Sequence, residues 1–219
     1  MALARAIGVP EGDPTLHTAV THSSYAAEHH IASNERLEFL GDAVVGLLIA
    51  ERAFTELDIA EGGLAQVRQA TVAEPSLAEA SRMLGVDRAM RLGRGEEASG
   101  GRDKDSLLAD AYEAVVAAVY LQGGLDAART VVLSSLDARY RIEAADPGAS
   151  DLKSRLQEWA ESNGLGTPVY AVVGTGPAHA QRFAAAVTIG DRVAGRGEGS
   201  SKKAAELAAA HAAWKGRDA

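Results

Sequence analysis

Apolar residues recur at intervals of three and four through the first two thirds of the chain, which is the spacing of one face of an α-helix. Glycines separate the periodic stretches, and no strand alternation precedes Asp146. The pattern predicts an all-helical region. Its helices are expected at residues 16–27, 35–57, 64–72, 76–83, 107–121 and 125–141.

The pattern changes after a short run of small residues with Pro147 and Gly148, and residues 144–150 are predicted to be a linker. Gly190-Asp191 predicts a hairpin turn between two strands, and Ser200 or Ser201 is expected to cap a closing Ala-rich helix. The order is therefore α-β-β-β-α. Its elements are expected at 151–162, 169–173, 182–189, 192–199 and 201–214. The fold class is multidomain: an all-α domain at 1–143, then an α+β domain at 151–217.

Acidic residues stand inside the most apolar predicted helices. Glu35, Glu38 and Asp42 are spaced i, i+3 and i+7, so they share one helical face, and Arg36 is the one basic residue between them. Asp110 and Glu113 share a face of a later helix rich in Ala and Val. Two buried helices are thus predicted to carry five acids with no evident basic partners.

Acids in an apolar environment are costly unless they are paired or bind a cation. Oxygen ligands suit Mg²⁺, which lowers the pKa of an attacking water and neutralises charge on a phosphate. The alternatives are a solvated acidic face and a buried acid network without metal. The apolar flanks favour a metal site for phosphodiester hydrolysis.

The composition of the chain further limits the class of protein to which it can belong. The 219 residues are 47% hydrophobic and contain no cysteine, which excludes disulfides and thiolate metal sites. We expect no membrane span and no secretory leader, and so a cytoplasmic protein. The net charge of −8 divides into +2 from Ser150 onward and −10 before it. Any nucleic-acid footprint must therefore be local.

Three stretches together resemble bacterial ribonuclease III over nearly the whole chain. They are Thr-His-Ser-Ser-Tyr at 21–25, Asn-Glu-Arg-Leu-Glu-Phe-Leu-Gly-Asp from Asn34, and residues 105–120 followed by Gly123-Gly124. The resemblance implies a homodimeric, Mg²⁺-dependent endonuclease for double-stranded RNA, with Mn²⁺ able to substitute. It also implies work on ribosomal RNA precursors and messenger RNA, with no organic cofactor and no membrane.

The same resemblance implies roles for particular residues. Glu38, Glu61, Asp110 and Glu113 would be the metal ligands, with Asp42 and Glu113 catalytic. Glu35 would be a supporting acid that faces RNA or the partner subunit, and Phe39 a knob in the dimer interface.

The α-β-β-β-α order looks like a double-stranded RNA-binding domain, which reads duplexes by shape. One exposed helix face carries Ser154, Gln157 and Glu158, and His179 lies in a loop between strands. Lys202 and Lys203 stand at a helix N-terminus, where backbone N–H groups also attract phosphate. These six residues are the predicted RNA contacts.

The chain departs from the usual ribonuclease III pattern at Thr71, Ala73 and Ala117, which puts local packing in doubt but removes no carboxylate.

One alternative function is that of a duplex-RNA-binding regulator with an inactive nuclease domain. The complete set of acids argues against it. Another is a di-iron carboxylate protein, which needs a Glu-x-x-His spacing that Glu38 and Glu113 lack. His22 is predicted to be a hydrogen-bonding residue rather than a catalytic base. No serine stands in the glycine-flanked turn of a serine hydrolase.

Overall fold

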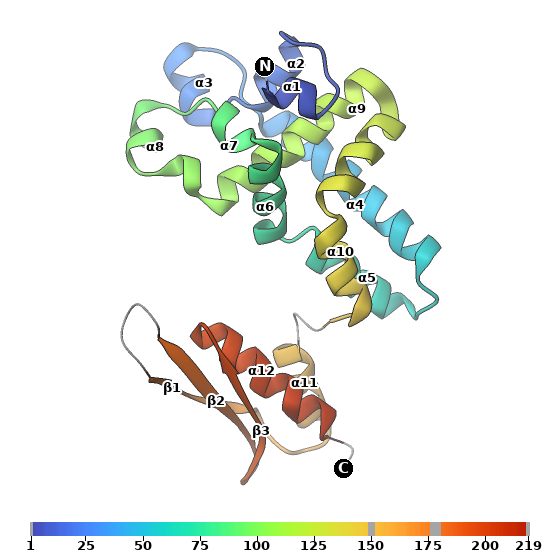
Figure 1. Cartoon of the computed structure of the whole chain (residues 1–219), viewed down its shortest axis with the longest axis vertical. Helices are drawn as coiled ribbons and strands as arrows, with labels where there is room; N and C mark the ends of the chain where they lie inside the picture. Colours follow the sequence, from blue (N-terminus) through green and yellow to red (C-terminus); the bar gives the residue numbers. More distant parts are fainter. Residues whose placement is uncertain (1, 149–151, 176–180, 218–219) are drawn as a thin grey trace. The chain divides into compact units, whose positions relative to one another are not determined.

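The computed structural model divides the chain into two compact units, Met1–Pro147 and Gly148–Ala219 (Figure 1). It describes residues 2–148, 152–175 and 181–217. The boundary falls inside the predicted linker. The prediction that this linker begins at residue 144 is wrong, because Ala144 and Ala145 still belong to a helix. Each unit has its own apolar core.

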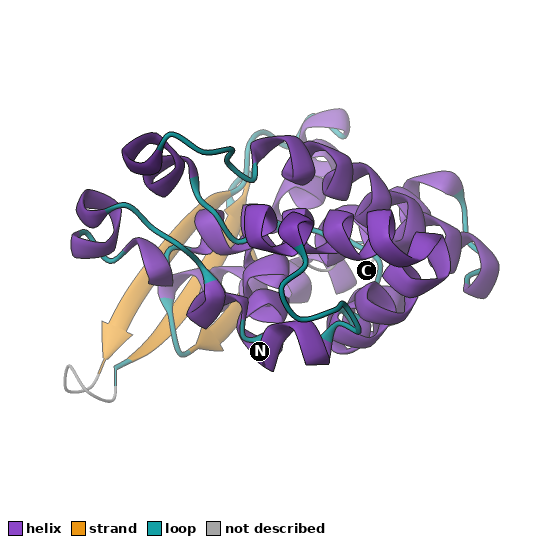
Figure 2. Ribbon diagram, turned by 90° about the horizontal axis from the view of Figure 1, so that it is seen from above, coloured by secondary structure: helices purple, strands orange, loops and turns teal. Residues whose placement is uncertain are grey.

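The described elements of the first unit are all helices (Figure 2), and an isolated β-bridge joins the segments at Thr21 and Arg91. The long helices α4 and α9 pack against each other, and α6 packs against α9. Leu48, Ile49, Tyr112 and Val116 are fully buried where these helices meet. No helix in the described ranges is long and apolar enough to cross a membrane. The elements are α1 (Ala2–Ala6), α2 (Pro14–Ala19), α3 (Ser23–His29), α4 (Glu35–Glu56), α5 (Glu61–Thr71), α6 (Glu74–Leu84), α7 (Val86–Ala89), α8 (Arg94–Ala98), the 3-10 turn η1 (Gly101–Asp103), α9 (Asp105–Ser135) and α10 (Asp137–Ala145).

Two predicted helices are each broken. The helix expected at 16–27 is split into α2 and α3, because the residues between them bond to Arg91. The His22 amide donates to the Arg91 carbonyl (3.1 Å), and the Arg91 amide donates to the Val20 carbonyl (2.7 Å). The helix expected at 125–141 is divided between α9, which kinks at Gly124 (φ 74°), and α10.

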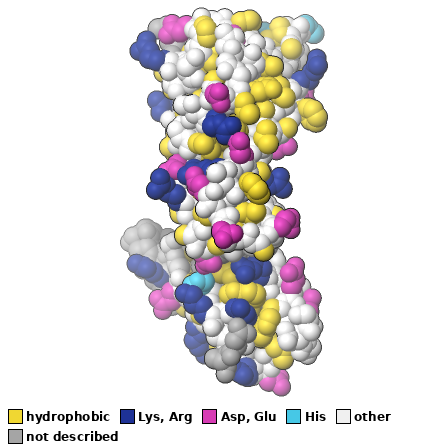
Figure 3. All heavy atoms as spheres, turned by 90° about the vertical axis from the view of Figure 1, so that its right-hand side faces the viewer, with side chains coloured by type: hydrophobic (Ala, Val, Ile, Leu, Met, Phe, Trp, Pro, Cys, Tyr) yellow, Lys and Arg dark blue, Asp and Glu magenta, His cyan; other side chains and the backbone are white. Residues whose placement is uncertain are grey.

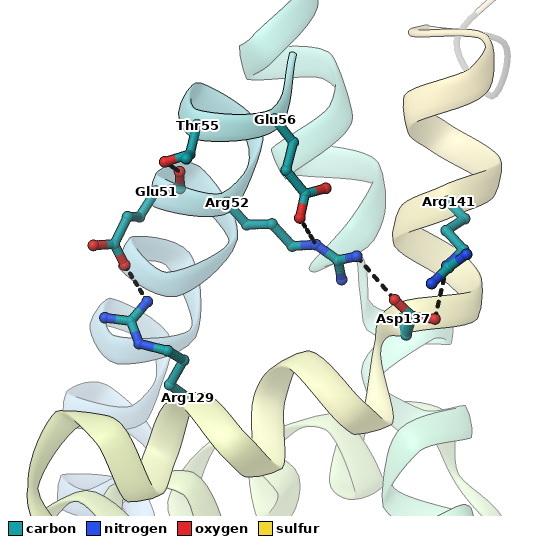
Figure 4. A network of polar contacts seen from close by, with 7 residues as sticks. All are labelled: Glu51, Arg52, Thr55, Glu56, Arg129, Asp137 and Arg141. Carbon is teal, nitrogen blue, oxygen red and sulfur yellow. Dashed lines mark hydrogen bonds and ion pairs between the residues drawn. The ribbon is translucent and has the colours of Figure 1, made fainter.

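A network of ion pairs fastens the C-terminal half of α4 to α9 and α10 (Figure 4). Arg52 donates to Glu56 (3.1 Å) and to Asp137 (2.9 Å), while its guanidinium stacks 3.9 Å from the ring centre of Tyr140. Asp137 also accepts from Arg141 (2.8 Å). Glu51, the residue before Arg52 on α4, pairs with Arg129 of α9. The end of α4 is therefore held in place independently of its acid-bearing start.

The second unit has the predicted order: α11 (Leu152–Ser162), β1 (Val169–Thr175), β2 (Arg182–Ile189), β3 (Arg192–Gly199) and α12 (Lys202–Lys215). Its strands form an antiparallel sheet in the order β1-β2-β3. Gly190 adopts φ 58° in the predicted hairpin turn. The hydroxyl of Ser201 accepts from the Ala204 amide (3.1 Å), which confirms Ser201 as the cap of α12.

Glycine and alanine bring β3 and α12 into direct backbone contact. Gly195, Gly197 and Gly199 alternate along β3, and we call these three residues the glycine stripe. A Cβ atom at Gly195 or Gly197 would overlap the backbone of α12, and one at Gly199 would lie 2.6 Å from the Ala205 amide nitrogen. Only a strand without side chains on this face can lie so close to the helix.

Candidate active site

The acid-bearing starts of α4 and α9 meet where Gly41 touches the backbone of Glu113. A Cβ atom at Gly41 would overlap the Glu113 carbonyl oxygen, so no other residue type allows this approach without a shift of one helix. Gly41 lies between Glu38 and Asp42 in sequence. The glycine of the Asn-Glu-Arg-Leu-Glu-Phe-Leu-Gly-Asp motif therefore brings acids of two helices together.

The electrostatics of the carboxylates show that they share one region. Burial, followed by the charges of Asp42, Glu38 and Asp110, raises the pKa of Glu113 to about 8. Burial also raises the pKa of Glu38, with further contributions from Asp110, Glu35 and Asp42. Both causes disfavour the charged form. The acids predicted on these two helices thus repel one another in the structure.

No ion pair relieves this repulsion in the part of the chain that the structure describes. Among the described residues, no ion pair involves Glu38, Asp42, Asp110 or Glu113. Half-buried carboxylates without a cationic neighbour are a typical arrangement for binding a metal ion.

One further acid reaches this region that the sequence reasoning missed. Glu74 is the first residue of α6, and after burial its charge is the largest contribution that raises the pKa of Asp110. The sequence offers the signal Glu74-Pro75 at a helix start. An acid there is also the ordinary complement of the helix dipole, so the signal does not distinguish the two roles.

The structure places the remaining predicted acids at the margin. Glu35 is exposed and accepts a hydrogen bond from the Ser33 hydroxyl (2.5 Å). Glu61 is the exposed first residue of α5, and it is not among the charges that raise the pKa of Glu38, Asp110 or Glu113. Within one chain, the described structure therefore does not bring Glu61 to the other acids, and its role as a ligand stays a prediction.

Five of the six predicted RNA contacts of the second unit lie on its surface. Ser154, Gln157 and Glu158 are exposed on α11, where Gln157 donates to Glu161 (2.9 Å). Lys202 and Lys203 are exposed in the first turn of α12. His179 lies outside the described residues.

Apolar side chains also gather on the surface of the first unit (Figure 3). Phe39 is 82% exposed on α4, which is unusual for a side chain of its size. A shallow pocket of about 450 Å³ opens nearby on the same helix, beside Leu37 and Leu40, with Leu121 of α9 in its wall. Surface of this kind marks an interaction site.

A helical unit with a cluster of unpaired acids, joined to an α-β-β-β-α unit, defines the class of two-domain nucleases that act on duplex RNA. Family models agree for both parts: Ribonuclease-III-like over residues 13–139, and Double-stranded RNA binding motif over residues 152–216. The chain belongs to the ribonuclease III family and is an endoribonuclease of double-stranded RNA.

Relatives that match nearly the full length of this chain support the assignment to the ribonuclease III family. Ribonuclease 3 of Thermobifida fusca is 46% identical over 95% of this chain and 88% of its own. Ribonuclease 3 of Symbiobacterium thermophilum is 48% identical over 96% of this chain and 91% of its own. A solved nuclease domain of ribonuclease III from Campylobacter jejuni is similar over 64% of this chain and 97% of its own, with 34% identity and a TM-score of 0.59. That structure concerns flexibility in a region involved in dimer formation.

Proposed function

We propose that the protein hydrolyses double-stranded RNA with Mg²⁺ bound at the carboxylates of α4 and α9, and that Mn²⁺ can substitute. The observation that carries this proposal is the crossing at Gly41, which gathers half-buried acids without a basic partner. The ligands would be Glu38, Asp110 and Glu113, with Glu61 as the further ligand that the family resemblance implies.

The donor set fits a hard cation by its chemistry. Every side chain is a carboxylate, and Mg²⁺ prefers oxygen and keeps several of its waters. As the side chains stand, no three acidic or histidine residues in the described ranges converge into a ready-made cage. A cation would replace mutual repulsion by attraction, so we expect the carboxylates to draw together around it.

The acidic side chains would have different roles in the reaction. Mg²⁺, when bound, lowers the pKa of an attacking water and neutralises charge on the phosphate. Asp42 is exposed at the edge of the acid cluster, where it can orient that water. Burial and the neighbouring acids raise the pKa of Glu113 to about 8, which favours its neutral form at neutral pH, and a bound cation would favour the charged form that can act as a ligand.

A homodimer would supply two such sites for the two strands of a duplex. We infer that Phe39 of each subunit enters the partner's pocket beside Leu37, Leu40 and Leu121. The support is the exposure of Phe39, the apolar wall of the pocket, and the dimer-forming region of the Campylobacter jejuni relative. A buried aromatic anchor in a pocket is a common energetic centre of an interface.

The second unit would bind the duplex through α11 and the start of α12, with Ser154, Gln157 and Glu158 at the minor groove and Lys202 and Lys203 at phosphates. His179 would contribute from its loop. The proposed substrates are ribosomal RNA precursors and messenger RNA in the cytoplasm, as the family resemblance implies.

The decisive experiment is cleavage of a long RNA duplex by wild type and Glu113→Gln over a series of Mg²⁺ concentrations. Wild type should cut only with the metal, and the variant should lose cleavage by several orders of magnitude. Duplex binding by the variant should be unchanged, because its second unit is intact. Cleavage by Glu113→Gln at a rate near that of wild type would show that the metal site is elsewhere.

A further inference from the structure

The two edges of the sheet in the second unit differ in how well they are protected against pairing with another strand. β3 carries Arg192, Arg196 and Glu198, and its pairing with β2 shifts register beside Val187 and Thr188. Charges and bulges are the usual devices that keep a sheet edge from pairing. β1, at the other edge, has neither, because its seven residues are uncharged and its pairing with β2 is regular throughout (Figure 1).

The outward side of β1 has no backbone partner in the described ranges. No backbone hydrogen bond there joins β1 to any segment other than β2. A strand in this position presents a row of N–H and C=O groups to which another strand can pair. The face of β1 that points away from the helices is apolar as well: Val169 is 66% and Val173 64% exposed, and Ala171 is exposed between them.

The sequence of β1 suits antiparallel pairing with a second copy of itself, centred on Val172. In this register Ala171 of one copy lies opposite Val173 of the other, on the exposed face of both strands. Tyr170 and Val172 face the core of the unit. Tyr170 would lie opposite Gly174, where an aromatic ring can cover the missing side chain, and Val172 would lie opposite itself. Apolar residues therefore meet apolar residues or glycine along the centre of the strand.

The charges also favour a second copy as the partner. Symmetric pairing of a charged strand brings like charges close together, and like charges directly opposite are destabilising. β1 contributes no such repulsion. The chain from Ser150 onward carries a net charge of only +2, so two second units repel each other little compared with two nuclease units.

We propose that β1 pairs antiparallel with β1 of a second copy of this chain, so that two second units share one continuous sheet. Pairing would link two RNA-binding units, which strengthens binding where both contact the same duplex. The contact is separate from the interface proposed for Phe39 and does not depend on the proposed metal site.

Disulfide cross-linking tests the register, because the chain has no cysteine of its own. The full chain is used without RNA, since a duplex could bring two copies together. A mixture of Ala171→Cys and Val173→Cys should form a disulfide between chains, because directly opposite Cβ atoms lie about 4.5–5.5 Å apart. Each variant alone should lose the disulfide, because its two cysteines would be about 7–8 Å apart.

The matched control is a mixture of Arg196→Cys and Glu198→Cys, which has the same spacing at exposed positions of β3. It should give no cross-link, because this edge is protected.

Charge reversal tests the same pairing by a second measurement. Ala171→Lys/Val173→Lys would place lysines opposite lysines, and Ala171→Glu/Val173→Glu would do the same with glutamates. Both positions are exposed, so the core of the unit is unchanged. Hydrogen exchange measures the protection of the β1 amides that do not bond to β2. We expect protection in wild type, its loss in each double variant, and its return in an equal mixture of the two.

Three results would overturn the proposal. A mixture of Ala171→Cys and Val173→Cys that gives no disulfide, or no more than the β3 control, would mean that β1 does not pair in this register. Unprotected outward amides in wild type would mean that the edge stays free. Protection that persists in both charge variants would mean that a different segment covers β1. None of these measurements uses Mg²⁺ or cleavage, so failure of the proposed metal-dependent function would not change them.

Discussion

At the scale of single residues, Glu113 shows how the acid cluster lowers the stability of the folded chain. Its side chain is half-buried and faces three other acids, and these causes raise its pKa from 4.5 to about 8. In an unfolded chain the same group would ionise at its ordinary pKa. Between these two values the unfolded chain releases a proton that the folded chain retains, so stability falls as pH rises through this window.

We therefore predict that, in a metal chelator, Glu113→Gln has a higher Tm than wild type, with little gain near pH 5 and a growing gain up to pH 8. The reason is that the amide cannot ionise. Thermal unfolding across this pH range measures the effect, and Glu79→Gln, an exposed acid on α6, is the matched control without a pH-dependent gain. A constant difference at every pH would contradict the prediction. Mg²⁺ should raise the Tm of wild type at pH 8 and not that of the variant.

At the scale of secondary-structure elements, the glycine stripe of β3 determines how closely α12 can lie on the sheet. We predict that Gly197→Ala destabilises the second unit by at least about 1–3 kcal/mol, since a methyl group would have to push two backbones apart. Unfolding and duplex binding of residues 148–219 test this. Gly216→Ala is the control, because its nearest contact would be an ordinary 3.6 Å. Equal stability of the two variants would show that β3 and α12 can move apart to accommodate a methyl group at little cost.

The elements also show what the sequence can and cannot predict. The bounds of β2 and β3 agree with the prediction because alternation and the Gly190-Asp191 turn are local signals. The break between α2 and α3 depends on hydrogen bonds to Arg91, which is distant in sequence, so local periodicity could not predict it. Likewise, spacing predicted the acids of α4 and α9, whereas Glu74 joins them only through the packing of α6 on α9.

At the scale of the whole molecule, the exposed face of α4 gives a test of assembly. We predict that Phe39→Ala weakens homodimerisation by about 2 kcal/mol or more, a loss of roughly 30-fold in affinity, because it removes an aromatic anchor. Sedimentation velocity over a dilution series measures it. Met83→Ala, which truncates another exposed apolar side chain of the same unit, should leave the dimer intact. An unchanged dimer in Phe39→Ala would place the interface elsewhere.

The division into two units predicts that each folds alone. A chain truncated after Pro147 keeps its core and should still dimerise and cut duplex RNA with Mg²⁺ at low salt. Its affinity should fall steeply at physiological salt, because the lost unit carries the predicted phosphate contacts. Binding titrations at several salt concentrations measure this. Equal affinity of the truncated and full chains at physiological salt would remove the second unit from RNA recognition.

The close contact between the glycine stripe and α12 requires small side chains in the core of the second unit, and this affects how the stability of the unit depends on temperature. Among the residues that the structure describes, six of the ten buried residues in the core of the second unit are alanines, so unfolding exposes little apolar surface per residue. The heat capacity of unfolding scales with that surface and is typically about 12–15 cal/mol/K per residue. This unit should fall below that range and have a flatter stability curve than the nuclease unit. Its free energy of unfolding should therefore change less between cold and warm growth conditions than that of the nuclease unit.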